Sequence, residues 1–167
     1  MKRGGLPHHR QGFTLIELLI TMALVGLASM VALPLYEVTS TRSKEVELRQ
    51  ALRTIRNGLD AYKAAVDSGT LARVAGETGY PRTLELLTES LETTARRDPG
   101  DAFQRIVILR QLPRDPFNQD PDVPAAQTWN TRSYASRSDD PQPGPDVFDV
   151  SSKSTRNGLD GTPYNTW

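Results

Sequence analysis

One uninterrupted apolar stretch constrains this chain more than any other feature of its sequence. Residues 13–36 read FTLIELLITMALVGLASMVALPLY, and Glu17 is the only charged residue among them. As an α-helix that rises 1.5 Å per residue, this stretch would extend roughly 36 Å, which exceeds the ~30 Å hydrocarbon layer of a membrane. The stretch therefore predicts a membrane-spanning helix.

The residues before this stretch predict its orientation. Residues 1–12 contain Lys2, Arg3 and Arg10 and no acid. Positive flanks stay on the cytoplasmic side of a membrane, so we expect a cytoplasmic N-terminus and an exported remainder. A secretory signal peptide has a shorter apolar core followed by a small-residue cleavage site, and neither fits here. A simple signal anchor remains the plain alternative.

Glu17 argues against that alternative. A carboxylate one helical turn inside an apolar span is costly, and such residues usually have a function. Cleavage between Gly12 and Phe13 would create an α-amino group one turn before Glu17. That amine could neutralise a carboxylate on its own helix or on a neighbouring one.

The segment GFTLIELLI, from Gly12 to Ile20, resembles the class III signal of type IV prepilins and pseudopilins. The resemblance implies cleavage after Gly12 by a prepilin peptidase and N-methylation of Phe13. It also implies that Glu17 guides each incoming subunit onto a growing filament. Pro34 fits this family, in which the apolar helix often bends or melts at a proline that lacks a backbone donor. Its alternative role is to end the membrane helix.

The chain becomes polar after the apolar stretch but keeps a helical period. One apolar stripe recurs at intervals of 4, 3, 4, 3 and 4 residues, comprising Leu48, Leu52, Ile55, Leu59, Tyr62 and Val66. This period predicts one helix over residues 13–68, membrane-embedded in 13–36 and amphipathic in 37–68. Favourable pairs are expected at Glu45–Arg49 and Arg56–Asp60. Gly58 marks either a close contact or no contact at all.

Residues 69–167 predict a globular head, and the whole chain an α+β, pilin-like fold. We expect a short helix or turn at Leu84–Leu91 and strands at Trp129–Tyr134 and Asp146–Val150. Phe103–Leu112 is apolar enough for a buried helix or strand, and its period does not decide between them. A small antiparallel sheet packed on the amphipathic helix would bury both apolar faces.

Short motifs in the head extend the resemblance. Their order is similar to that in the major pseudopilin of type II secretion, and they are Gly79-Tyr80-Pro81, Leu112–Phe117 (LPRDPF), Asp146-Val147-Phe148 and Trp167. That family binds calcium in a loop near its C-terminus, but the matching residues 150–164 contain one acid, Asp160. Calcium takes six to eight oxygen ligands, so only a weak site at Ser151, Ser152 and Asp160 is conceivable. The alternative is a hydrogen-bonded loop held by Tyr164 and Trp167.

Composition narrows the possible functions. The chain has no Cys, and its two histidines, His8 and His9, lie in the leader. Without residues 1–12, thiolate or imidazole catalysis and zinc sites are therefore excluded, which disfavours a membrane-anchored periplasmic enzyme. The remaining chain carries 17 basic against 20 acidic side chains, since the leader holds three of the 20 basic residues. A mildly acidic chain is not expected to bind nucleic acid.

The resemblance implies a structural subunit of a periplasmic pseudopilus for type II secretion. Its expected partners are copies of itself, a prepilin peptidase, minor pseudopilins, membrane lipid, and an inner-membrane platform with its ATPase. We expect a single-pass protein of the bacterial inner membrane with a periplasmic head. A type IV pilin for adhesion, motility or DNA uptake is the alternative of the same architecture.

Overall fold

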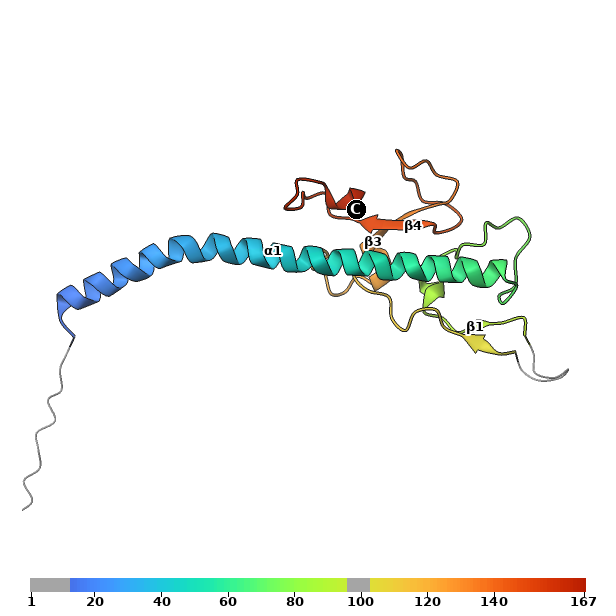
Figure 1. Cartoon of the computed structure of the whole chain (residues 1–167), viewed down its shortest axis with the longest axis horizontal. Helices are drawn as coiled ribbons and strands as arrows, with labels where there is room; N and C mark the ends of the chain where they lie inside the picture. Colours follow the sequence, from blue (N-terminus) through green and yellow to red (C-terminus); the bar gives the residue numbers. More distant parts are fainter. Residues whose placement is uncertain (1–12, 96–102) are drawn as a thin grey trace, which may run out of the picture. The chain divides into compact units, whose positions relative to one another are not determined.

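The computed structural model of the chain describes residues 13–95 and 103–167 (Figure 1). Gly12 and the rest of the leader lie outside the described residues. The fold is α+β and pilin-like, with one long helix and two small antiparallel sheets. The described elements, in order, are α1 (Leu15–Asp67), η1 (Glu85–Leu87), β1 (Leu91–Glu92), β2 (Arg105–Ile106), η2 (Ala125–Thr128), β3 (Trp129–Arg132), β4 (Asp149–Ser152) and η3 (Tyr164–Thr166). Two compact units divide the chain, one up to Ser40 and the other from Thr41 to Trp167.

Helix α1 confirms the long helix expected from the sequence. Its backbone is helical on both sides of Pro34, so the helix neither ends nor melts at that residue. The helix stops after Asp67 because Gly69 adopts a φ of 74°, the left-handed conformation that commonly terminates helices. A role for Pro34 in assembly stays a prediction.

The apolar stripe of α1 forms the centre of the core in the second unit. Leu48, Ile55 and Leu59 are fully buried, and Tyr62 packs against the same core partly buried. The head contributes the opposing side chains, which are Leu84, Leu87, Leu112, Trp129, Val147, Val150 and Tyr164. The stripe therefore packs on the head as predicted, although loops and short 3-10 turns supply more of its partners than the strands do.

Each sheet has two short antiparallel strands. In one sheet Leu91 pairs with Ile106, and in the other Trp129 pairs with Ser152 and Thr131 with Val150. Trp129 and Val150 turn toward the core, so the sheet of β3 and β4 covers the stripe of α1. This arrangement confirms the predicted strand at Trp129–Tyr134 over most of its length.

Three expected elements of the head differ in extent from the structure. The short helix or turn expected at Leu84–Leu91 is present as a turn, limited to η1. Phe103–Leu112 is neither a helix nor a long strand, because β2 has two residues and Leu109 then donates its N–H to the Leu87 carbonyl. The strand expected at Asp146–Val150 begins three residues later, at Asp149.

The two expected ion pairs within α1 are also replaced by bonds to the head. Glu45 accepts hydrogen bonds from Leu159 and Tyr164 instead of pairing with Arg49. Arg56 pairs with Asp149 rather than with Asp60. Both side chains lie beside the buried stripe, where the head offers them partners; Glu45 is buried there, whereas Arg56 stays partly exposed.

Candidate functional site

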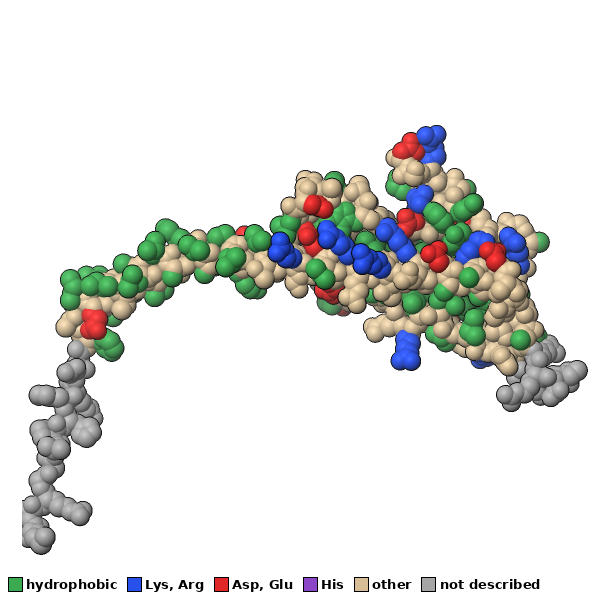
Figure 2. Space-filling model, viewed as in Figure 1, with side chains coloured by type: hydrophobic (Ala, Val, Ile, Leu, Met, Phe, Trp, Pro, Cys, Tyr) green, Lys and Arg blue, Asp and Glu red, His purple; other side chains and the backbone are tan. Residues whose placement is uncertain are grey.

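The first unit presents its apolar side chains to the outside. Phe13 is 86% exposed and Leu33 66% exposed, and hydrophobic side chains follow the N-terminal part of α1 in Figure 2. Hydroxyls in this part bond back to the helix itself, as Ser29 Oγ does to the Val25 carbonyl. α1 is long and apolar enough to cross a membrane. Such a surface requires lipid or other apolar helices around it.

Glu17 is the one charged side chain in residues 13–36. Its backbone N–H donates to Thr14 Oγ1 at 3.2 Å, so Thr14 caps the helix that begins at Leu15. The pattern Thr-x-x-Glu from Thr14 to Glu17 is that of a capping box, a sequence signal for the start of this helix. Within residues 13–95 and 103–167, however, no donor or cation bonds to the Glu17 carboxylate. The carboxylate therefore remains available to a partner.

This arrangement of an exposed apolar helix with one unpaired carboxylate near its start is what a filament-forming subunit needs. Residues 7–33 match the prokaryotic N-terminal methylation motif. The match includes Gly12, Phe13 and Glu17, and it supports a type IV pilin-like protein. No curated protein and no solved structure matches the chain.

The methylation motif has three consequences. It implies processing by a prepilin peptidase and assembly with other pilin-like subunits. Together with the apolar part of α1, it fits anchoring in a membrane. It suggests a structural role for the protein rather than an enzymatic one. The cleavage site itself, after Gly12, lies outside the described residues.

In the second unit, the C-terminal loop is tied to α1 by Glu45. The Glu45 side chain is buried, and its Oε1 accepts hydrogen bonds from the Leu159 N–H at 2.6 Å and the Tyr164 hydroxyl at 3.0 Å. Burial, followed by the hydrogen bond to Glu45, raises the pKa of Tyr164 to about 12. The Tyr164 hydroxyl therefore stays protonated and keeps donating to the carboxylate across the physiological range.

Trp167 and Tyr164 hold the C-terminal end of the same loop. Trp167 Nε1 donates to Thr162 Oγ1 at 2.7 Å, and the guanidinium of Arg49 lies 4.3 Å from the centre of the Trp167 ring. Tyr164 stacks on Phe117 at 4.1 Å between ring centres. These contacts give the hydrogen-bonded loop that the sequence offered as the alternative to a calcium site.

The three calcium candidates have other partners. Ser152 Oγ donates to Asp115 Oδ2 at 2.5 Å, while Ser151 is paired with Asn130 across the sheet. Hydrogen bonds from the hydroxyl and then the N–H of Thr162 lower the pKa of Asp160. In the part of the chain that is described, no three Asp, Glu, His or Cys side chains gather where they could hold a metal ion.

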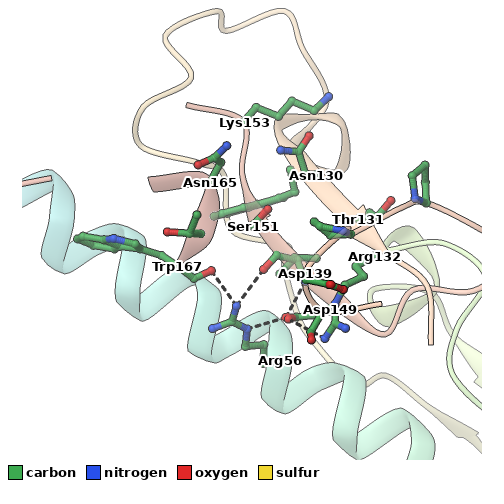
Figure 3. A pocket seen from close by; sticks show the side chains of 16 residues that line it. Arg56, Asn130, Thr131, Arg132, Asp139, Asp149, Ser151, Lys153, Asn165 and Trp167 are labelled. Atoms are coloured by element: carbon green, nitrogen blue, oxygen red, sulfur yellow. Dashed lines mark hydrogen bonds and ion pairs between the residues drawn. The ribbon is translucent and has the colours of Figure 1, made fainter. Parts of the chain in front are cut away.

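Arg56 joins α1 to both the sheet and the C-terminus (Figure 3). Its Nε donates to Asp149 Oδ1 at 2.7 Å, and its Nη2 donates to the carbonyls of Val150 and Trp167 at 3.1 and 2.9 Å. A cavity of about 700 Å³ opens beside these groups and is also lined by Arg132 and Lys153. Asp149 pairs with both Arg56 and Arg132, so one carboxylate serves two cations there. Local sequence patterns do not predict this role of Arg56, since Asp149 lies 93 residues away.

Two acids of the head motifs noted in the sequence, Asp146 and Asp115, accept hydrogen bonds from residues of neighbouring segments. Asp146 accepts hydrogen bonds from Ser133 Oγ and Thr78 Oγ1, both at 2.5 Å, and from the Tyr134 N–H. Burial alone would raise the pKa of Asp146, but these hydrogen bonds outweigh it and leave the pKa lowered. Asp115 likewise accepts hydrogen bonds from the Phe117 N–H and from Ser152 Oγ. The motif acids therefore hold loops together.

Proposed function

We propose that this protein is a structural subunit of a periplasmic pseudopilus that drives type II protein secretion across the outer membrane. The observation that carries the proposal is the exposed apolar part of α1 with the unpaired carboxylate of Glu17. A prepilin peptidase would remove residues 1–12 and leave Phe13 as the N-methylated first residue. The processed subunit would wait in the bacterial inner membrane with its head in the periplasm.

Assembly follows from the electrostatics of the apolar helix. A buried carboxylate is costly unless a cation neutralises it, and the new α-amino group of Phe13 is such a cation. Glu17 of one subunit would bind the Phe13 amine of an adjacent subunit as their apolar helices bundle. A membrane platform with its ATPase would extract the subunits, and minor pseudopilins would join the filament.

Secretion is favoured over a surface pilus by the head. The motifs that resemble those of the major pseudopilin contribute to the core of this head and to the hydrogen bonds between its segments. Leu112 and Trp167 pack in or against the core, and Asp115 accepts a hydrogen bond from Ser152. The chain has no Cys, so it lacks the C-terminal disulfide loop that many adhesive pilins carry. The proposal requires no cofactor, because Glu45 and Trp167 hold the C-terminal loop. Calcium at Asp160 would be an addition to these contacts.

The test compares culture supernatants of a strain lacking this chain with those of its parent. We expect secreted proteins to disappear and to return with the wild-type chain but not with Glu17→Ala. Glu37→Ala is the matched control, because it removes an exposed acid from the same helix just beyond the apolar stretch. That variant should restore secretion.

Other outcomes would favour the alternatives. Unchanged supernatants with lost surface fibres or motility would identify a type IV pilin of the same fold. A membrane-extracted chain whose mass still includes residues 1–12, in cells with active prepilin peptidase, would contradict any pilin-like function. That result would favour the alternative of a membrane-anchored periplasmic enzyme.

A further inference from the structure

Arginines gather along one side of α1 in the second unit. Arg42, Arg49, Arg53 and Arg56 follow one another at intervals of 7, 4 and 3 residues. At 100° per residue, these positions fall within about 60° of one another around the helix. Figure 2 shows Lys and Arg side chains in succession along this part of α1. The helix therefore has a basic side next to its buried stripe.

This basic side is hollowed at one place. A groove of about 150 Å³ is lined by Arg49, Arg53, Arg56, Leu52 and Trp167. Arg49 is 3.7 Å from Asp160, and Arg56 is bound to Asp149. Arg53 is exposed and makes no hydrogen bond or ion pair within the described residues. The groove, which we call the arginine groove, therefore has room and positive charge for a carboxylate.

The same helix carries a matching carboxylate on another side. Glu47 is exposed and has no partner among the residues that the structure describes. It lies roughly 120° or more around the helix from Arg49 and Arg53, so it cannot reach the groove of its own chain. Two complementary surfaces on different sides of one subunit are what a head-to-tail, filament-forming contact requires.

We propose that Glu47 of one copy binds in the arginine groove of the next copy in the filament. This inference rests on the proposed function, which supplies the register. Pairing the Phe13 amine of one copy with Glu17 of its neighbour displaces parallel helices by four residues, about 6 Å. In residue count, residue 47 of one copy then corresponds to residue 51 of its neighbour, which lies between Arg49 and Arg53 in the sequence.

The shape and charge of the groove favour a protein side chain as its occupant. A hollow of about 150 Å³ suits a single carboxylate, whereas a lipid headgroup layer would meet a broad flat surface. The wall formed by Trp167 and Leu52 excludes water from one side of the groove, which strengthens a charge-assisted hydrogen bond inside it. A second copy of this chain supplies such a carboxylate through the exposed side chain of Glu47.

The experiment reverses the two charges in the full-length chain, expressed in the strain that lacks it. Filaments are sheared from cells, pelleted and quantified against the processed chain left in the membrane. We expect Arg53→Glu and Glu47→Arg each to reduce filament yield about tenfold, because like charges would then face each other. The double variant should recover yield to within about threefold of wild type, since it restores opposite charges. Arg73→Glu, at another exposed arginine without a partner in the described chain, should leave the yield unchanged.

Rescue by the double variant cannot arise within one helix, because residues 47 and 53 are six positions apart. The inference is overturned if the double variant is no better than either single variant, or if Arg53→Glu matches Arg73→Glu. It is also overturned if Arg53→Glu lowers the processed chain in the membrane equally, which would indicate a lipid contact or a folding defect. Absence of filaments from the wild-type chain would contradict the proposed function itself and remove this inference with it.

Discussion

At the scale of single residues, the second unit depends on side chains of α1 that reach across to distant loops. Glu45 is buried and accepts two hydrogen bonds from residues 114 and 119 positions later in the chain. Arg56 makes comparable bonds to Asp149 and to the carbonyl of Trp167. These residues read in the sequence as ordinary members of solvent-exposed helical pairs. Nothing in their spacing predicts that the C-terminal loop is attached through them.

The role of Glu45 can be measured by its removal. Glu45→Ala leaves the buried Tyr164 hydroxyl and the Leu159 N–H without their acceptor. Because hydrogen bonds to a charged group contribute more than neutral ones, we expect the free energy of unfolding to fall by about 3 kcal/mol. Urea unfolding of the detergent-solubilised chain, followed by tryptophan fluorescence, would report the change through Trp167.

Glu47→Ala is the matched control for that measurement. Glu47 is two residues away on the same helix, but it is exposed and has no partner within the described chain. We expect its removal to change stability by less than about 0.5 kcal/mol. Equal effects of the two substitutions would mean that the Glu45 hydrogen bonds do not hold the loop.

At the scale of elements, the helix was predictable and the sheets were predictable only in part. The apolar run and the stripe from Leu48 to Val66 are local patterns, and α1 follows them almost to the residue. The strands are two to four residues long, too short for a period-two pattern to place their ends. The N–H of Val147 bonds to the Pro81 carbonyl, a contact between distant residues that delays β4 until Asp149.

Gly58 shows how a helix position can be set by what packs on it. A Cβ at this position would come within 3.0 Å of Leu109 Cδ1 and 3.1 Å of its Cγ. The backbone of Leu109 is held by the hydrogen bond from its N–H to the Leu87 carbonyl at 2.7 Å, so any relief of this contact has to come from its side chain. The close contact that the sequence left open is therefore present.

We expect Gly58→Ala to lower the free energy of unfolding by about 1 kcal/mol. Alanine gains about 1 kcal/mol in helix propensity, but overpacking against Leu109 costs more, typically 1 to about 3 kcal/mol. Asn57→Ala, at the exposed neighbouring position, should stabilise the chain slightly through propensity alone. Thermal unfolding of both variants decides the point, since a stabilised Gly58→Ala would show that Leu109 moves aside easily.

At the scale of the whole molecule, the chain divides its tasks between two units. The first unit holds the features that the sequence revealed directly, Phe13 and Glu17 in an apolar helix, because their motif is contiguous. The second unit, from Thr41 to Trp167, contains every core residue that the structure describes. Its arginine groove combines α1 with Trp167, so the sequence alone could not indicate it.

Because the second unit contains this core, we expect residues 41–167 alone to fold as a soluble monomer without the apolar half of α1. An unfolded fragment would show that the second unit needs the apolar helix for its stability.

We further expect the same melting temperature in EDTA and in millimolar calcium, since Glu45 and Trp167 hold the loop that contains Asp160. An ion bound only to the folded state would instead stabilise it by RT ln(1 + [L]/Kd), or about 2.7 kcal/mol at a hundred times its Kd. A calcium-dependent rise in melting temperature that Asp160→Asn abolishes would therefore establish a metal site in this loop.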